Sequence, residues 1–211
     1  MYIPVTGKVI TPDMKEALID FVESGKEITY GEYNELFEKK FAKYVGKKHA
    51  FFVNSGSSAN LLAFATYVQL GRAKPGDEII TVAASFPTTV TPILQYGCVP
   101  VFLDIDTTLN IDATKLEEAY TEKTKGVFIA HTLGNPFNID MVQEFCNKHG
   151  LFLIMDACDA LDSRWNEVNV AHYGDIVTFS FYPAHHITTG VGGMVATDDD
   201  KLARIIFSLR N

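Results

Sequence analysis

Residues 139–159 read IDMVQEFCNKHGLFLIMDACD, and this segment is the most informative one for the fold class. Apolar residues have the spacing of a helix over 139–149, whereas 151–155 form a short, continuous apolar run. A continuously apolar strand beside a helix is typical of a parallel sheet that helices cover on both faces. Asp156 follows the run directly, at the edge of the sheet where such folds bind their ligands.

The same alternation of apolar runs and helical patterns continues outward in both directions. Helical patterns occur at 59–70 and 114–120. Further apolar runs bring the expected total to about seven strands; these runs are 50–53, 79–83, 99–103, 127–130, 176–181 and 193–197. The sequence therefore predicts an α/β fold of three layers, with a mostly parallel seven-stranded sheet between two layers of helices.

The N-terminal part has no strand pattern. A helix start at Thr11 and an apolar stripe that ends near Val22 predict one helix. A second helical stripe begins near Tyr33. We expect residues 1–30 to form an N-terminal helical segment and residues 31–211 to form one large domain. The chain ends inside a predicted helix, so we also expect it to lack a further C-terminal domain.

The composition excludes several classes of function. With 47% hydrophobic and 21% charged residues, the chain has the balance of an ordinary globular protein. Its formal net charge of -8 argues against a broad basic surface for nucleic acid. No apolar run reaches the roughly 18 residues that a membrane-spanning helix needs, and the N-terminus lacks the apolar core of a signal peptide.

The cysteines favour a reducing compartment. Cys98, Cys146 and Cys158 are an odd number at wide spacing, which suits neither a disulfide framework nor a metal site. We interpret them as small buried apolar residues. The simplest location for such a protein is the cytoplasm.

Small and polar residues follow the first predicted strand. Gly56, Ser57 and Ser58 open a helix there, and a helix N-terminus with small residues and hydroxyl groups can hold a phosphate. The segment is neither a Walker loop nor a dinucleotide fingerprint. The same residues could equally be no more than a polar helix cap.

Three other strand ends carry candidate residues. Phe86 could stack on a flat ring or lie in the core. Asp156 could pair with a protonated pyridine nitrogen, cap a helix or form a structural salt bridge. The segment 180–190, SFYPAHHITTG, places two histidines in a polar loop, which favours acid–base catalysis without establishing it.

Taken in this order, five segments resemble those of fold-type-I pyridoxal phosphate enzymes of the sugar-aminotransferase family; they are SGSSANLLAF, KPGDEIITVAASFPTTV, IAHTLGNPFN, MDACDAL and SFYPAHHITTG. The resemblance extends from about residue 7 to the end. Ordinary members read Ser-Phe-His-Pro-x-Lys-His in the last motif, and the lysine binds the cofactor covalently. Here His185 stands at the lysine position and Tyr182 at that of the first histidine, and no lysine occurs over 150–200.

This pattern is similar to the CDP-4-keto-6-deoxyglucose 3-dehydrase branch, which removes a hydroxyl group from a nucleotide-linked keto-sugar. The GDP-4-keto-6-deoxymannose 3-dehydratase branch shares the lysine-to-histidine change but looks less similar around it. The resemblance implies pyridoxamine 5′-phosphate as the working cofactor, because that form carries its own amine. It also implies that His185 is the catalytic base at the cofactor.

The resemblance implies further roles in cofactor binding. Asp156 would pair with the pyridine nitrogen and Phe86 would stack on the ring. Asp159 and Tyr182 would line the ring edge and favour the amine form. The phosphate would be held by Gly56, Ser57, Ser58 and Ser180, and weaker candidates for the same pocket are His131 and Asn135.

The expected substrate is a nucleotide-diphosphate keto-sugar, and the expected assembly is a homodimer. Relatives in the CDP-sugar branch carry a 2Fe–2S cluster in a C-terminal part and receive electrons from a flavin or iron–sulfur reductase. The three cysteines here do not match that cluster motif, so we expect a cluster only in a part absent from this chain. Val191 also departs from the Gly-Glu-Gly-Gly of the branch, so the resemblance implies cofactor binding more directly than it implies activity.

Two alternatives stay open. A conventional nucleotide-sugar aminotransferase would need a lysine at the cofactor, and only a remote one such as Lys201 could supply it. A non-catalytic fragment that binds a cofactor or a partner protein would need none. Loss of the C3 hydroxyl from the sugar distinguishes the dehydrase from both.

Overall fold

The structure is a computed structural model of the 211-residue chain and describes residues 10–26 and 28–211. Within these residues one seven-stranded sheet has the order β1-β9-β8-β5-β4-β2-β3. Its strands are β1 (His49–Val53), β2 (Glu78–Val82), β3 (Val99–Leu103), β4 (Thr124–Ala130), β5 (Phe152–Asp156), β8 (Ile176–Ser180) and β9 (Gly193–Thr197).

The sheet is mostly parallel, as the sequence predicts. Strand β9 pairs antiparallel with both of its neighbours, β1 and β8, and all other pairs in the sheet are parallel. Six strands therefore point the same way, and their carboxyl ends meet at one edge. A separate ribbon joins β6 (Arg164–Trp165) to β7 (Val168–Asn169).

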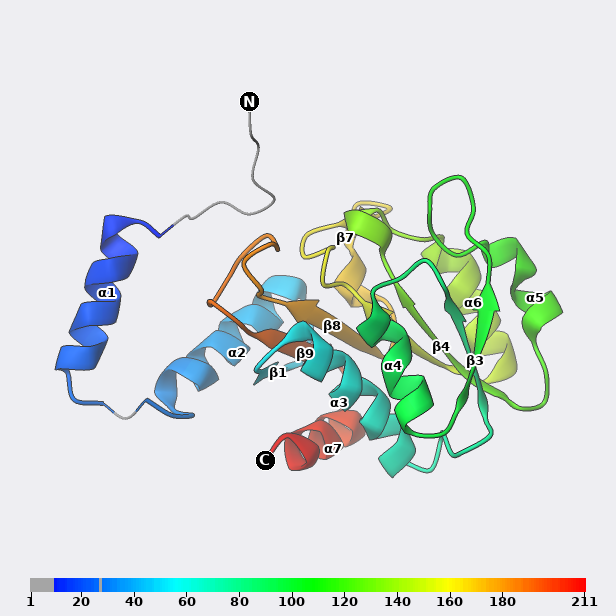
Figure 1. The fold of residues 1–211 in the computed structure, drawn as a ribbon, viewed down its shortest axis with the longest axis horizontal. Coiled ribbons are helices and arrows are strands. Elements are labelled where there is room, and N and C mark those ends of the chain that lie inside the picture. The colour runs from blue at the N-terminus through cyan, green and yellow to red at the C-terminus, as the bar shows by residue number, and fades with distance from the viewer. Residues whose placement is uncertain (1–9, 27) are drawn as a thin grey trace.

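Helices cover both faces of the sheet (Figure 1), which confirms the three-layer prediction. One apolar cluster packs α2 (Glu32–Val45), α5 (Leu116–Ala119) and α6 (Ile139–His149) against one face. A second cluster packs α3 (Gly56–Gln69), α4 (Pro87–Gln95) and α7 (Asp200–Arg210) against the other. Three short 3₁₀ helices, η1 (Ala113–Lys115), η2 (Thr132–Gly134) and η3 (Val170–His172), lie in the connections.

Strand β5 explains why its sequence is apolar throughout. All five of its residues are buried. Successive side chains alternate between faces, so Phe152 and Ile154 join one cluster while Leu153 and Met155 join the other. A strand at the centre of a sheet with two covered faces has no polar side, and the charge of Asp156 comes only where the strand ends.

The helix predicted near Thr11 is present as α1 (Pro12–Glu23). The Thr11 hydroxyl caps it by accepting a hydrogen bond from the Met14 amide at 3.3 Å. No residue of α1 is buried, and Figure 1 shows it standing away from the sheet. Residues 1–9 lie outside the described residues, and the division at residue 30 stays a prediction. No helix in the described ranges combines the length and the apolar character needed to cross a membrane.

Candidate functional site

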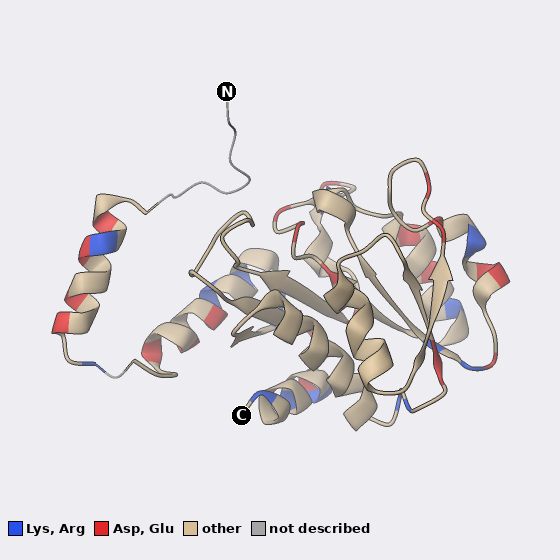
Figure 2. Cartoon of the chain, viewed as in Figure 1, with Lys and Arg blue, Asp and Glu red and all other residues tan. Residues whose placement is uncertain are grey.

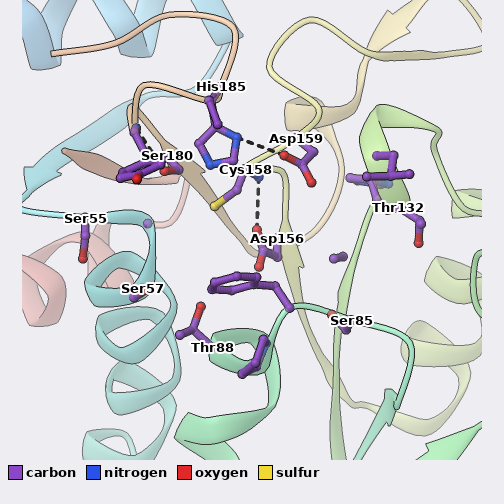
Figure 3. Close-up of a pocket in the computed structure, with 18 of the residues that line it drawn as sticks. Ser55, Ser57, Ser85, Thr88, Thr132, Asp156, Cys158, Asp159, Ser180 and His185 are labelled. Carbon is purple, nitrogen blue, oxygen red and sulfur yellow. Dashed lines mark hydrogen bonds and ion pairs between the residues drawn. The ribbon is translucent and has the colours of Figure 1, made fainter. Parts of the chain in front are cut away.

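A cavity of about 920 Å³ lies at the edge of the sheet where the parallel strands end. Its walls come from the segments that follow β1, β2, β4, β5 and β8 (Figure 3). Nearly all of the residues singled out in the sequence line it: Gly56, Ser57, Phe86, His131, Asp156, Asp159, Ser180, Tyr182 and His185. Ser58 and Asn135 are not among the lining residues.

The start of α3 forms one wall. Ser55 caps this helix by accepting a hydrogen bond from the Ser58 amide, and its hydroxyl also donates to the Ser58 hydroxyl, both at 3.1 Å. A Cβ added at Gly56 would stand 2.7 Å from Cβ of Ser180 and 2.9 Å from Sγ of Cys158. Only glycine therefore lets the helix begin so close to the end of β8. The free N–H groups of the first helical turn suit an anion there.

The cavity wall contains no lysine or arginine among the described residues. Helices α3 and α4, which flank it, carry no charged residue, and Figure 2 shows both in tan. An anionic ligand would therefore depend on backbone N–H groups and hydroxyl groups rather than on cationic side chains.

Asp156 is a buried carboxylate with neutral partners. Its side chain ends β5, and the residue is 4% exposed. Its Oδ2 accepts hydrogen bonds from Nδ2 of Asn60 at 2.7 Å and from the Thr89 hydroxyl at 2.8 Å. Its Oδ1 accepts one from the Cys158 amide at 3.1 Å. Because no cation pairs with this carboxylate among the described residues, a cationic group of a ligand would stabilise it.

Sequence reasoning missed the support of this carboxylate. The Thr178 hydroxyl donates to Oδ1 of Asn60 at 2.6 Å, which fixes the direction of the Asn60 amide. Thr89 and Asn60 are both buried. One signal was available: Asn60 is a polar residue among the buried apolar residues of α3, beside Ala59. Such a residue needs a buried partner.

His185 and Asp159 contact each other in the cavity wall. Nδ1 of His185 lies 2.9 Å from Oδ1 of Asp159, and Figure 3 shows the two side chains pointing toward each other. The His185 side chain is 20% exposed and that of Asp159 47%. The Tyr182 ring lies 6.5 Å from the imidazole, centroid to centroid. The structure thus joins two residues that the sequence placed in the same pocket but did not pair.

His131 is a second imidazole in the cavity wall, and unlike His185 it is buried and forms no ion pair with any described residue. It is 1% exposed and stacks on Phe137 with the ring centroids 4.3 Å apart. Neither ring nitrogen has a hydrogen-bond partner in the described part of the chain, and the Ser85 hydroxyl has none either. Burial lowers the pKa of His131 to about 3, so the ring is neutral at physiological pH.

Cys158 is not an activated nucleophile. Burial raises the pKa of its thiol well above the usual value, and the negative charge of Asp156 raises it further. The group therefore stays a thiol at neutral pH. The prediction that all three cysteines are buried holds for Cys98 and Cys146, whereas Cys158 is half-buried in the cavity wall.

The side chains of Phe86 and Val191, whose surroundings the sequence left open, are both exposed. Phe86 is 68% exposed, so it is not a core residue, and its ring is free to contact a ligand in the cavity. Val191 is 62% exposed, and its carbonyl accepts a hydrogen bond from the Thr189 hydroxyl at 2.8 Å. This hydrogen bond lies within the turn 189–191.

The loop after β4 is held by hydrogen bonds to the side chain of Asn110. Leu133 lines the cavity with a φ of 51°, a left-handed conformation that costs energy for a residue other than glycine. Buried Asn110 holds the loop, because its Oδ1 accepts from the Thr132 amide at 3.0 Å and its Nδ2 donates to the Asn135 carbonyl at 3.1 Å. Asn135 thus anchors the loop through its backbone.

Comparison with known families gives a match over nearly the whole chain. The profile of the DegT/DnrJ/EryC1/StrS aminotransferase family matches residues 8–211. The lipopolysaccharide biosynthesis protein RfbH of Salmonella typhimurium is 49% identical, over 99% of this chain and 49% of its own length. A dTDP-4-dehydro-2,6-dideoxy-D-glucose 3-dehydratase of Saccharopolyspora spinosa is 46% identical, over 98% of this chain and 46% of its own.

Solved structures agree with this match. A GDP-4-keto-6-deoxymannose-3-dehydratase with a trapped PLP-glutamate geminal diamine superposes with a TM-score of 0.92 at 37% identity, over 98% of this chain and 54% of that one. The Helicobacter pylori aminotransferase PseC superposes with a TM-score of 0.92 at 30% identity, over 99% of this chain and 55% of that one. The chain therefore spans about half the length of the proteins it matches.

Proposed function

The chain belongs to the DegT/DnrJ/EryC1/StrS aminotransferase family, and from this we propose that it is the cofactor-binding part of a pyridoxamine-phosphate-dependent sugar 3-dehydrase. Its substrate would be a nucleotide-linked 4-keto-6-deoxyhexose of dideoxysugar and lipopolysaccharide biosynthesis. One observation carries the proposal. His185 lines the cavity and no described lysine does, and the sequence resemblance aligns His185 with the family's lysine.

The residues present fit the cofactor. The buried Asp156 carboxylate has only neutral donors, so it can accept the protonated pyridine nitrogen as its cationic partner. The hydrogen-bonding capacity of the His131 ring and of the Ser85 hydroxyl is unmet around the same cavity. Because Gly56 has no side chain, the start of α3 lies close to Ser180 in the cavity wall, where its free N–H groups can bind a phosphate.

We assign the cofactor contacts accordingly. Asp156 would bind the ring nitrogen, and Phe86 would stack on the ring. Asp159 and Tyr182 would lie at the ring edge. The phosphate would be bound by Gly56, Ser57 and Ser180, whereas the Ser58 amide and hydroxyl both contact Ser55 and make it the weakest member of the predicted set.

When bound, pyridoxamine phosphate supplies an amine that condenses with the sugar ketone and a ring that delocalises electrons. The chain must then move one proton at the cofactor's C4′ carbon. His185 suits this step because an imidazole can act both as a base and as an acid. The same ring, once protonated, can give its proton to the departing C3 hydroxyl. Asn60 and Thr89 both donate hydrogen bonds to Oδ2 of Asp156 and hold the buried carboxylate in place at the cavity wall.

An aminotransferase function is less well supported. Lys201, the remote lysine considered above, lies in a different pocket beside Tyr67 and Asp199. It therefore does not line the cavity that holds His185 and Asp156. Sequence identity also favours the dehydrase, since a GDP-4-keto-6-deoxy-D-mannose 3-dehydratase of Escherichia coli O55:H7 is 39% identical over 94% of this chain, whereas the aminotransferase PseC is 30% identical.

Turnover tests the proposal directly. The chain is supplied with pyridoxamine phosphate, a reductant and a nucleotide-linked 4-keto-6-deoxyhexose, and the products are followed by mass spectrometry. We expect loss of the C3 hydroxyl, and we expect His185→Asn to lower the rate at least about 100-fold. His186→Asn is the matched control, because that neighbouring histidine is exposed and does not line the cavity.

Two outcomes would contradict the proposal. Transfer of the cofactor's amino group to the sugar would identify an aminotransferase. Tight cofactor binding without any conversion would favour the non-catalytic fragment. The homodimer, the reductase, the 2Fe–2S cluster in a C-terminal part and the cytoplasmic location stay predictions from the family resemblance.

A further inference from the structure

The contact between His185 and Asp159 uses a particular atom of the imidazole. Nδ1 of His185 lies 2.9 Å from the Asp159 carboxylate. The two other histidine–carboxylate pairs in the described residues, His149 with Glu117 and His49 with Asp200, both use Nε2 instead. Pairing through Nδ1 leaves Nε2, the outer nitrogen of the ring, available to a ligand.

Close contacts and hydrogen bonds hold the backbone around both Asp159 and His185. On the Asp159 side, a Cβ added at Gly134 would lie 2.6 Å from the Asp159 carbonyl oxygen, so the loops after β4 and β5 are in close contact. The Ser163 hydroxyl donates to the Gly134 carbonyl at 2.6 Å and holds these loops together. The Ala160 amide donates to the Ala157 carbonyl at 2.9 Å, which closes the turn that contains Asp159.

The His185 side is anchored in the same way. Its amide donates to the Tyr182 carbonyl at 2.9 Å, which forms a turn. The Phe181 amide donates to the Gly192 carbonyl at 2.8 Å and closes the base of the loop. The Thr188 hydroxyl donates to the Phe181 carbonyl at 2.7 Å. These hydrogen bonds hold the backbone on both sides of His185, which places its imidazole beside the Asp159 carboxylate.

A neutral imidazole has one N–H donor and one acceptor nitrogen, and the partner of one nitrogen decides the state of the other. A carboxylate beside Nδ1 accepts the Nδ1–H and leaves the lone pair on Nε2. It also stabilises the imidazolium that forms when Nε2 takes up a proton. In this structure the His185–Asp159 contact has the distance of an ion pair but not the alignment of a hydrogen bond. Catalytic contacts are often imperfectly aligned in ligand-free enzymes and tighten when the ligand binds.

We propose that Asp159 is a positioning residue for His185: its carboxylate holds Nδ1, so that Nε2 is the atom that moves the proton at the reacting carbon. This role rests on the proposed function, because it names how the base of that site is oriented. It adds a task for Asp159 beyond contact with the ring edge of a cofactor.

The tautomer of His185 is the readout that tests this proposal. Long-range proton–nitrogen NMR spectra of the ¹⁵N-labelled chain distinguish the two neutral tautomers, and His185→Asn identifies the His185 signals. We expect the Nδ1–H form in the wild type. In Asp159→Ala we expect the Nε2–H form, which predominates for histidine free in water, and in Asp159→Glu we expect the Nδ1–H form to return.

Glu117→Ala is the matched control. It removes the carboxylate that pairs with His149 outside the cavity. It should change the His149 signals and leave those of His185 unchanged. Because the Asp159 side chain is 47% exposed, its alanine variant should keep the fold, and unchanged signals from the other histidines verify this.

Kinetics supply the second readout. We expect Asp159→Ala to lower kcat about 100-fold with KM changed less than about threefold, as for loss of a group that acts in the transition state. An unchanged His185 tautomer in Asp159→Ala would overturn the positioning role, whatever the chain catalyses. Failure of dehydration with the expected tautomer change would overturn only the proposed function, so the two failures are distinguishable.

Discussion

Nδ2 of Asn60 donates a hydrogen bond of 2.7 Å to Oδ2 of Asp156, and the two residues are only 1% and 4% exposed. The bond links α3, whose first turn faces the cavity, to the carboxylate that ends β5. The two ends of the candidate cofactor site, one suited to a phosphate and one to a ring nitrogen, are thus held at a fixed separation by a buried amide.

Asn60→Ala should therefore weaken both the fold and the site. The change leaves the Thr178 hydroxyl without its acceptor and removes one of the donors to Asp156. We expect a loss of about 1–3 kcal/mol in the free energy of unfolding, measured by urea titration, together with weaker binding of pyridoxamine phosphate. Asn147→Ala, at an exposed position of α6, should change stability by less than about 0.5 kcal/mol. Equal effects of the two substitutions would contradict this account.

Gly56→Ala tests the close approach of α3 to β8. The new methyl group would press on Cβ of Ser180 at 2.7 Å, and the surrounding structure would have to move. We expect a loss of about 1–3 kcal/mol in the free energy of unfolding, measured by urea titration. We also expect weaker binding of pyridoxamine phosphate through its phosphate group. Gly31→Ala is the control, since a Cβ there meets nothing within 4 Å. A Gly56→Ala variant as stable as the control would show that the gap can relax.

The buried His131 ring predicts a pH dependence of stability. Burial lowers its pKa to about 3, whereas the unfolded chain has a histidine pKa of about 6.5. Between these values the unfolded state binds a proton that the folded state does not. The stability that the neutral ring permits is therefore fully present above pH 6.5 and is lost as the pH falls toward 3.

Substituting His131→Phe should remove this dependence. Phenylalanine keeps the stacking on Phe137 and leaves no unpaired nitrogen, so stability at neutral pH should be equal or higher. Urea unfolding at pH 7.5 and 5.5 should show a smaller acid loss in the variant than in the wild type, by about 1 kcal/mol. Identical acid losses in the two proteins would mean that His131 has a partner in solution.

Much of the fold could be predicted from the sequence, because burial on both faces imposes a simple pattern on the strands. The run 151–155 corresponds to β5 with one residue of offset at each end. The carboxyl ends of parallel strands meet at one edge, so residues as distant as Gly56, Asp156 and His185 could be expected in one cavity. The order of the strands in the sheet could not, because periodicity does not specify neighbours.

The fine structure of the site could not be predicted for a different reason. The pairing of His185 with Asp159 depends on how two irregular loops close, and no periodic pattern encodes that closure. The exposure of Phe86 was likewise open, since an aromatic residue at a strand end suits either the core or a ligand. The roles of these residues in binding and catalysis stay predictions until ligands are tested.

We propose that this chain binds an amine-form cofactor without a covalent lysine link, with His185 in the lysine's place. The most direct test adds pyridoxamine phosphate and pyridoxal phosphate separately, records absorbance and affinity, and treats the second mixture with borohydride. We expect tight binding of pyridoxamine phosphate and no adduct fixed to the protein. A covalent adduct on a lysine, identified by peptide mass spectrometry, would contradict it and indicate an aminotransferase.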